Sequence, residues 1–516
     1  MSDQLIRPRS RFDRFTRIGE LGDALHVLMP KLLFGVGLLT LAMVLKLFFT
    51  ETPGWLALAC IGAGTCVALV SWQSAGTGLP LLPLIALQHL IVYGVPLVSR
   101  NEVITGYPEG LIDQAGFEVL VMLVFASVGW LLGMRLFSPF SPTARVLRVF
   151  VTEGNRAINY LGVALIVLAA GYELLNSLGI VGAVMGLLPA GTHSIVVAMI
   201  NAAGMSGYFL VAMFIASGEA TTSTRNTFWI VMSGHLVMLT SSLLLSSVIN
   251  IIGAVVIGLF WGSGRLPKRF LITCAIILSF LNLGKFEMRE RYWGSSSETS
   301  LAAVSLTGLP GYYAEWIGHS YHKLFGPSDP EDSLRDDKRQ TMLARVDNMQ
   351  NLLFAVDGIA NRGVEPLRGA TYSIIPPLLI PRVFWSEKPR THEGQVMLNV
   401  HFQRQSRAES FTTYIAWGLL PEAYGNFGSV WGAAILGLVL GLAFAWIENA
   451  TSAKPLLSLE GLVTFAMFIG IAASFEMVSS VLITSLFQSA VTITIACLPF
   501  VQTMVVVRPS ELQEDS

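Results

Sequence analysis

Four basic side chains are gathered around one proline-rich segment, residues 365–394. Arg368, Arg382, Lys388 and Arg390 lie at the edges of its apolar run. Guanidinium groups pair with phosphate through a bidentate fork, so cations held near a bilayer suit an anionic, lipid-linked substrate. The alternative is attraction to anionic lipid head groups, which needs basic residues but no fixed geometry.

The prolines of this segment predict its backbone. Pro376, Pro377 and Pro381 interrupt the run YSIIPPLLIP, which is apolar but too short to cross a membrane. Each proline fixes its own φ and disfavours the helical region for the preceding residue. We therefore expect a stiff, extended backbone that frames the cations.

A carboxylate with polar neighbours stands in the segment LLPEAYGNFGSVWG, residues 419–432. Glu422 is followed by Tyr424 and Asn426. A carboxylate near an apolar boundary has a raised pKa, which suits general acid-base work. The alternative is the polar N-terminal segment of a helix, with glycines that allow close packing.

A helix is predicted over residues 344–363, with Arg345 at its start. Its apolar side chains recur at helical spacing, at Val346, Met349, Leu352, Leu353 and Val356. The helix either lies along the membrane face, with Arg345 snorkelling towards head groups, or contributes to a substrate site.

The elements that position these residues follow from composition. Of 516 residues, 53% are hydrophobic and 13% are charged, and the mean hydropathy is +0.61. Soluble domains carry about 25% charged residues. Apolar stretches of about 20 residues recur, each long enough to cross a bilayer and too continuous for the strands of an outer-membrane barrel. The sequence predicts an all-α polytopic membrane protein.

We expect about 12 transmembrane helices. They are predicted at residues 31–50, 55–73, 80–98, 117–137, 158–176, 194–216, 227–245, 247–263, 269–284, 429–447, 457–475 and 480–506. The run 227–263 exceeds one crossing, and we divide it near Ser246 and Ser247 into a helix pair with almost no loop.

The orientation follows from the positive-inside rule. The basic segments 1–30, 135–157 and 264–269 fall on one side by parity, and the acidic loop 99–116 falls on the other. We therefore place the basic N-terminus (1–30) and the tail (507–516) in the cytoplasm, with transmembrane helices 1–9 in residues 31–284 and helices 10–12 in residues 429–506. No cleavable signal peptide is expected, because the N-terminal polar segment is too long.

One large loop, residues 285–428, separates helices 9 and 10 and faces outward. It holds nearly half of the charges of the chain, and loops of this length are usually functional or disordered. Most of it is rich in aromatic residues and should pack, so we expect it to be the active-site region. In a bacterium with two membranes, the loop is periplasmic and the spans lie in the inner membrane.

Polar groups within the spans are the remaining candidates, since intramembrane ionisable residues are functional by default. They are Lys46, Gln88, His89, Glu173, His235 and Glu476. Snorkelling accounts for those at span ends, and the two histidines leave open either interhelical hydrogen bonding or proton-coupled transport. No nucleotide-binding, zinc-protease or serine-hydrolase motif is present, and the four cysteines lie in apolar spans, so we expect no cofactor and no metal.

The outward loop resembles that of the O-antigen polymerase family, the Wzy-type oligosaccharide repeat-unit polymerases. The resemblance is carried, in chain order, by Arg345 before an apolar helix, G-x-T-Y at 369–372, IPRVFWSEKP at 380–389 and EAYGNFG at 422–428. Ser386 and Glu387 stand where the family often has Pro-Asp. The matching motifs cover roughly residues 345–432.

The resemblance implies a GT-C-like membrane glycosyltransferase. Such enzymes transfer a glycan from undecaprenyl pyrophosphate to another lipid-linked repeat unit, without a metal, and they work with flippase and chain-length regulator proteins. Arg345, Arg382 and Glu422 are then catalytic, with the arginines on the pyrophosphate and Glu422 as proton acceptor. Arg368, Tyr372, Trp385, Lys388, Arg390, Tyr424 and Asn426 are the expected substrate-binding residues.

Two other functions remain open. An O-antigen ligase uses the same donor and needs the same pyrophosphate clamp and base. A polysaccharide or lipid-linked oligosaccharide transporter predicts charges along the span interiors and short outward loops, and this chain shows the reverse. The product is O-antigen, capsule or exopolysaccharide, and no nucleic-acid partner is expected.

Overall fold

The fold is taken from a computed structural model of the chain. It describes residues 18–99, 101–137, 145–150, 156–185, 192–243, 245–263, 265–292, 306–326, 347–380, 384–385, 387–412, 415–454, 458–472, 474, 476–498 and 501–506. These residues form two compact units. Unit 1 takes its described residues from Val149–Arg339 and Gln488–Gln502, and unit 2 from Thr16–Arg148, Gln340–Phe487 and Thr503–Ser516.

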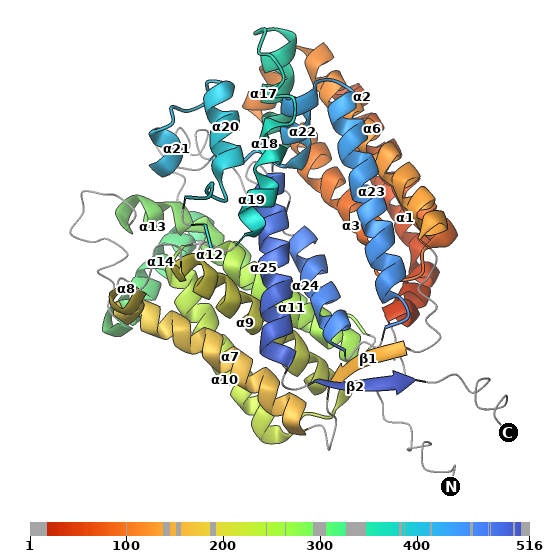
Figure 1. The fold of residues 1–516 in the computed structure, drawn as a ribbon. Helices are drawn as coiled ribbons and strands as arrows, with labels where there is room; N and C mark the ends of the chain where they lie inside the picture. The colour runs from red at the N-terminus through yellow and green to blue at the C-terminus, as the bar shows by residue number, and fades with distance from the viewer. Residues whose placement is uncertain are drawn as a thin grey trace, which may run out of the picture. The chain divides into compact units, whose positions relative to one another are not determined.

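Unit 2 is built on long apolar helices that pack side by side. Its helices are α1 (Ile18–Phe49), α2 (Trp55–Ala75), α3 (Leu81–His89), α4 (Val95–Val98), α5 (Glu102–Thr105), α6 (Glu109–Leu136), α23 (Trp431–Thr451) and α24 (Leu459–Ala472). Helix α3 continues through the π-helix η2 (Leu90–Gly94) into α4. Helix α6 packs against both α2 and α23 (Figure 1). Gly437 and Gly441 of α23 lie directly on the backbone of α6, where any side chain would collide, as small residues do where membrane helices meet closely.

Short helices cover one end of unit 2. They are α17 (Met349–Ala360), α18 (Ala370–Ser373), α19 (Ile375–Leu379), α20 (Glu393–His401), α21 (Glu409–Thr412) and α22 (Leu419–Phe427), followed further along the chain by the start of α25 (Ser479–Cys497). Helix α17 packs against α6 and α22, and α18 packs against α20 and α22. The second half of the predicted outward loop is therefore folded onto the helices of unit 2.

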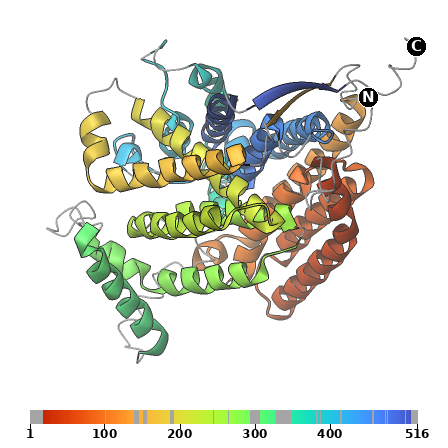
Figure 2. The same cartoon turned by 90° about the horizontal axis from the view of Figure 1, so that it is seen from below.

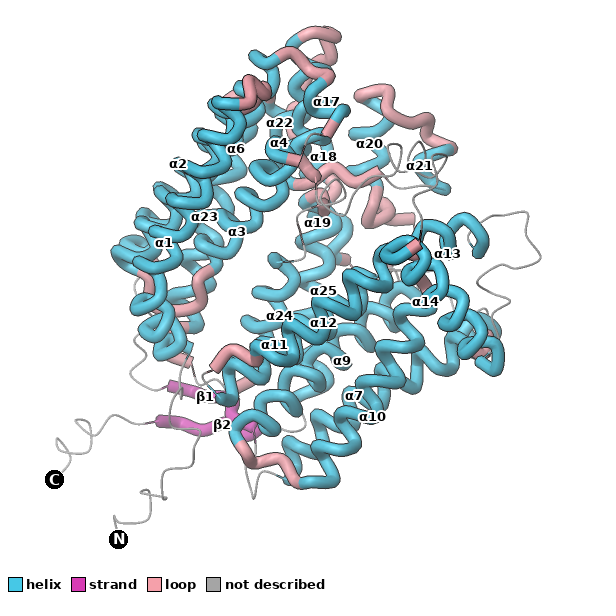
Figure 3. Tube along the Cα trace, turned by 180° about the vertical axis from the view of Figure 1, so that it is seen from behind, coloured by secondary structure: helices cyan, strands magenta, loops and turns pink. Residues whose placement is uncertain are grey.

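Unit 1 holds the helices of the middle of the chain. They are α7 (Arg156–Ser177), α8 (Ile180–Met185), α9 (Thr192–Ser217), α10 (Thr222–Ser241), α11 (Leu245–Ser263), α12 (Lys268–Leu283), α13 (Lys285–Tyr292), η4 (Leu306–Gly308) and α14 (Leu309–Phe325). Helix α9 packs between α7 and α11, and Figures 2 and 3 show these helices side by side. Helices α12 and α13 meet at a 50° bend, and α14 packs against both.

Two short strands complete the fold. Strands β1 (Arg145–Phe150) and β2 (Val501–Val506) pair as a two-stranded sheet. Every other element of the described residues is helical, which with the long apolar helices is consistent with the predicted helical membrane protein, while β1 and β2 depart from the all-α prediction. The range 480–506 was predicted as one span, but its helix ends at Cys497 and its last residues form β2.

A helix lies at each of the 12 predicted spans, but their ability to cross a membrane differs. In the described part of the chain, seven helices are long and apolar enough to span, or eight if α12 and α13 count as one bent span. Helices α24 and α25 are shorter apolar helices. The run 227–263 is divided into two helices, as predicted. Helix α10 ends at Ser241 and α11 begins at Leu245, so the break lies a few residues before the predicted position at Ser246 and Ser247.

Two local predictions for the outward loop need correction. Residues 370–379 form the short helices α18 and α19 and are not extended, because Pro376 and Pro377 occupy the first turn of α19, where no backbone N–H is needed. The predicted helix at 344–363 is present as Met349–Ala360, but its apolar residues Leu352, Leu353 and Val356 are fully buried in unit 2 rather than facing a membrane.

Candidate functional site

Glu422 lies in the first turn of α22, and its side chain is 0% exposed. Its Oε1 accepts a hydrogen bond from Thr371 Oγ1 at 2.7 Å, and its Oε2 accepts one from the backbone N–H of Ser479 at 2.6 Å. Ser479 is the first residue of α25, so the carboxylate also lies at the positive end of that helix. Three segments that are distant in the sequence therefore meet at one carboxylate.

Asn426 extends this network by one helical turn. Its Nδ2 donates to Thr371 Oγ1 at 2.8 Å and to the Glu422 carbonyl at 2.8 Å. Thr371 Oγ1 thus accepts from Asn426 and donates to Glu422, which fixes the orientation of its hydroxyl. The network of Thr371, Glu422, Asn426 and Ser479 is fully buried apart from 6% of Ser479.

The backbone around Arg368 brings α18 to this network. Arg368 has a φ of 51° and Gly369 a φ of 87°, both in the left-handed region. A non-glycine residue there stores about 1–3 kcal/mol of strain. The backbone N–H of Arg368 donates to the Asn426 carbonyl at 2.8 Å, and that of Leu367 donates to the Gly425 carbonyl at 3.0 Å. These bonds hold the turn against α22 and place Thr371 over Glu422.

The pKa values of the network follow from its burial. Burial raises the pKa of the Glu422 carboxyl, while hydrogen bonds from Ser479 and Thr371 oppose this change. Burial, and next the charge of Glu422, raise the pKa of Tyr372 well above its ordinary value. The Tyr372 ring stacks on Phe427, with 5.8 Å between ring centroids. Tyr372, Asn426 and Glu422, predicted from separate motifs, are thus brought together.

Tyr424 belongs to a second network, between α22 and α6. Its hydroxyl accepts a hydrogen bond from Gln114 Nε2 at 3.0 Å, and burial, followed by the charge of Glu118, raises its pKa to about 12. Glu118 accepts from Ser429 Oγ at 2.6 Å and from the backbone N–H of Val430 at 3.0 Å. Val430 has a φ of 64°, which is strained for a β-branched side chain. Glu118 therefore anchors the turn that follows α22.

Lys388 is engaged with backbone carbonyls. Its Nζ donates to the carbonyls of Leu378 at 2.8 Å and Ile380 at 2.6 Å. These carbonyls lie at the C-terminal end of α19, where a cation satisfies groups that have no partner within the helix. The ammonium thus stabilises the end of α19 in this conformation.

Of the other predicted site residues, three have exposed side chains and two lie outside the described part of the chain. The side chain of Arg368 is 84% exposed and lies 3.9 Å from Glu365, and those of Trp385 and Arg390 are also exposed. Arg345 and Arg382, the two predicted catalytic arginines, lie outside the described residues.

Sequence reasoning missed another basic cluster in unit 2. The guanidinium of Arg404 lies 5.1 Å from the ring centroid of Phe354 and 5.8 Å from that of Trp417. Arg362 lies 4.4 Å from the same Phe354 centroid and pairs with Asp357 at 3.0 Å. These residues come from α17, from the segments after α17 and α20, and from the segment before α22, and no spacing in the sequence links them.

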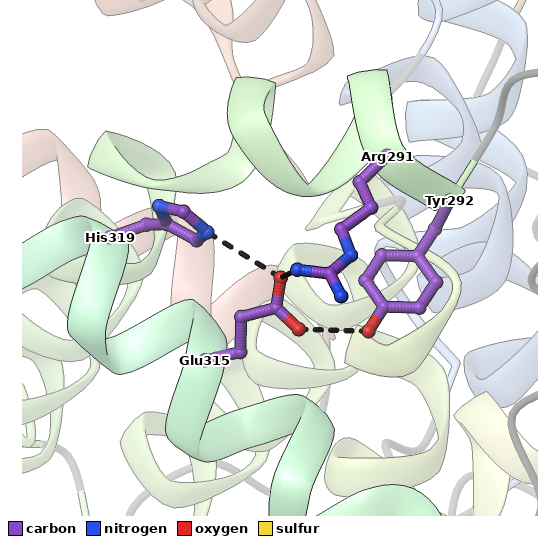
Figure 4. Close-up of polar contacts among 4 residues, drawn as sticks. All are labelled: Arg291, Tyr292, Glu315 and His319. Carbon is purple, nitrogen blue, oxygen red and sulfur yellow. Dashed lines mark hydrogen bonds and ion pairs between the residues drawn. The ribbon is translucent and has the colours of Figure 1, made fainter. Parts of the chain in front are cut away.

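Unit 1 has an ionic cluster of a different kind between α13 and α14. Glu315 accepts from Arg291 Nη1 at 2.5 Å and from the Tyr292 hydroxyl at 2.9 Å, and His319 Nε2 lies 3.5 Å away (Figure 4). Each carboxylate oxygen has a partner, so the cluster holds the two helices together. Among the described residues, no group of three or more His, Cys, Asp or Glu side chains could hold a metal ion.

Three of the polar residues in the predicted spans have hydrogen-bond partners. Gln88 Nε2 donates to the carbonyl of Ala472 at 2.9 Å, His89 Nδ1 lies 2.8 Å from the Ile85 carbonyl, and His235 Nδ1 lies 2.9 Å from the Tyr208 hydroxyl. Such bonds between and within helices favour a packing role for both histidines.

Comparison of the chain with protein-family models, curated proteins and solved structures gives no match.

Proposed function

We propose that this chain is a glycosyltransferase of the bacterial inner membrane that polymerises undecaprenyl-pyrophosphate-linked repeat units into a surface polysaccharide. One observation supports this function above the others. The motif at 369–372 and the motif at 422–428 meet through Thr371, Glu422 and Asn426. Motifs that resemble those of a polymerase in sequence thus also form one polar site in space.

The reaction is a single displacement at a sugar. A hydroxyl of the acceptor unit attacks the anomeric carbon of the donor glycan, and the bond from that carbon to the pyrophosphate oxygen breaks. Undecaprenyl pyrophosphate leaves with the bonding electrons, and Glu422 accepts the proton of the attacking hydroxyl. Arg345 and Arg382 neutralise the charge that develops on the pyrophosphate.

The burial of Glu422 sets a condition on this chemistry. Both carboxylate oxygens already accept hydrogen bonds, from Thr371 and Ser479. Each oxygen could still accept a further hydrogen bond, but Glu422 is 0% exposed, so the acceptor hydroxyl reaches it only if surrounding segments such as α18 or the start of α25 move. Without that movement, Glu422 positions Thr371 and does not take the proton.

Gene deletion in the host separates this function from its rivals. A polymerase mutant retains surface glycan with a single repeat unit on an intact anchor. Polymer that accumulates on the lipid carrier, with none attached to the anchor, indicates a ligase instead. A gel of the surface glycan distinguishes these outcomes.

Complementation of the deletion strain then tests the proposed role of Arg382 at the pyrophosphate. The Arg382→Ala variant, expressed at the wild-type level, should restore little or no polymer. Wild-type chain length from this variant would exclude a catalytic role for Arg382.

A further inference from the structure

Arg404 is a half-buried cation with few protein partners. Its Nη1 lies 3.5 Å from the Ala416 carbonyl, at the limit of a hydrogen bond. An arginine presents five N–H donors in a rigid fork, so most of this hydrogen-bonding capacity is left over. No carboxylate in the described part of the chain lies within ion-pair distance of Arg404.

The surroundings fix the position of this cation. The rings of Phe354 and Trp417 flank the guanidinium, and Trp417 is itself fully buried and donates from Nε1 to Asn399 Oδ1 at 2.7 Å. Aromatic rings attract a guanidinium but leave its in-plane N–H donors free to bind another group. The two rings therefore hold the guanidinium of Arg404 in place.

Further polar groups surround the same place. Burial, and next the charge of Asp357, raise the pKa of Tyr107, in the turn between α5 and α6, while the charges of Arg362 and Arg404 oppose this change. Burial lowers the pKa of Arg404, and Tyr107 is the one charge partner that opposes this change. The guanidinium groups of Arg362 and Arg404 meet at the ring of Phe354, and Asp357 neutralises that of Arg362.

A neighbouring arginine, Arg407, differs from Arg404 in its exposure and in having a carboxylate partner. Arg407 is 68% exposed and pairs with Glu393 at 3.1 Å. Arg404 is more deeply buried and lacks such a carboxylate among the described residues. A desolvated cation without a counter-charge is costly, and an anion that enters the site relieves this cost.

We propose that Arg404, held against the rings of Phe354 and Trp417, binds an oxyanion, either a phosphate or a carboxylate group. Arg404 is not among the arginines that the sequence predicts to bind pyrophosphate. Its identification with the lipid pyrophosphate or with an acidic sugar of the repeat unit rests on the proposed function, whereas oxyanion binding itself does not. The competing explanation is that Arg404 only fills space between aromatic rings.

Direct binding to the full-length protein tests this site. The protein is placed in nanodiscs of phosphatidylcholine, and calorimetry measures binding of inorganic pyrophosphate, farnesyl pyrophosphate, glucuronate and, as a neutral control, glucose. We expect Arg404→Gln to raise the Kd of the bound oxyanion at least tenfold. Arg404→Lys should give an intermediate loss, because lysine keeps the charge but not the fork. Arg407→Gln, the matched control, should bind like the wild type.

Each outcome decides the proposal. Binding of the pyrophosphates alone identifies a phosphate site, and binding of glucuronate alone identifies an acidic-sugar site. The proposal is wrong if the wild type binds neither better than glucose, or if Arg404→Gln and Arg407→Gln weaken binding equally. If Arg404→Gln does not fold, the Arg404→Lys variant carries the test, and unchanged affinity there would also contradict the bidentate site. Binding without any polymerase phenotype in the deletion strain would overturn the proposed function and leave this site standing.

Discussion

At the scale of single residues, burial and hydrogen bonding set the properties of the candidate site. The sequence predicts Glu422 as a site residue because it is a carboxylate with polar neighbours beside an apolar boundary. Its partners, Thr371 and Ser479, lie 51 and 57 residues away and are ordinary residue types for their segments. Thr371 falls within the G-x-T-Y motif but was not singled out as a site residue, and nothing in the sequence marks Ser479, because the role of each arises from packing between segments.

Asp347 gives a pH-dependent prediction at this scale. It is 3% exposed, it accepts a hydrogen bond from Asn101 Nδ2 at 2.6 Å, and burial raises its pKa from 3.8 to about 6. A carboxyl whose pKa is raised by folding contributes stability below about pH 4, and this contribution is lost as the pH rises through 6. The free energy of unfolding of the wild type should thus fall by about 1 kcal/mol more between pH 5 and 7.5 than that of Asp347→Asn.

Thermal unfolding of both proteins in the same detergent, at pH 5 and pH 7.5, measures this difference. The Asn side chain keeps an acceptor for the neighbouring N–H groups and cannot ionise. Equal pH dependence in the two proteins would show that Asp347 does not titrate in this range.

At the scale of elements, the turn between α22 and α23 combines strain with an anchor. Val430 has a φ of 64°. Glu118 holds it there by accepting hydrogen bonds from the backbone N–H of Val430 and from the hydroxyl of Ser429. In the sequence, the glycines of FGSVWG were interpreted as allowing close packing, and no residue was predicted to take the left-handed conformation. Glycine would be the usual choice there.

Replacement of Val430 by glycine should therefore stabilise the protein. Relief of the strained φ exceeds the entropic cost of glycine by about 1 kcal/mol, and little packing is lost because Val430 is 41% exposed. Val439→Gly is the matched control, since Val439 is 58% exposed in the middle of α23 and should lose about 1 kcal/mol. A drop in the thermal midpoint of both variants would contradict the strain at Val430.

The other elements show where sequence patterns succeed. The 3.6-residue periodicity located α17, and long apolar runs located a helix at each predicted span. Periodicity gives the apolar face of α17 but not its partner, and this face is buried in unit 2 and not against lipid. The prolines of 376–377 were interpreted as breakers, although they also suit the first turn of a helix such as α19.

At the scale of the whole molecule, the predicted topology places the loop of residues 285–428 outside and residues 264–269 inside. The described helices that are long enough to span number seven or eight, so their orientation needs a direct measurement. Ser373 and Leu266 are exposed and lie in the two regions.

Cysteine labelling supplies this measurement. In a background without the four native cysteines, Ser373→Cys should react with a membrane-impermeant maleimide in spheroplasts. Leu266→Cys should react only after the membrane is opened. The opposite pattern would invert the topology and remove the candidate site from the outer face.

The central claim is that the site around Glu422 joins lipid-linked repeat units, and its most direct test is polymerisation by the purified protein. Undecaprenyl-pyrophosphate-linked repeat units, isolated from the deletion strain, are supplied to the wild type and to Glu422→Gln in lipid vesicles, and the products are separated on a gel. We predict a ladder of polymers from the wild type and a loss of at least a hundredfold in rate for Glu422→Gln, which resembles the protonated carboxyl in shape. A full ladder from Glu422→Gln, or no ladder from the wild type, would contradict the claim.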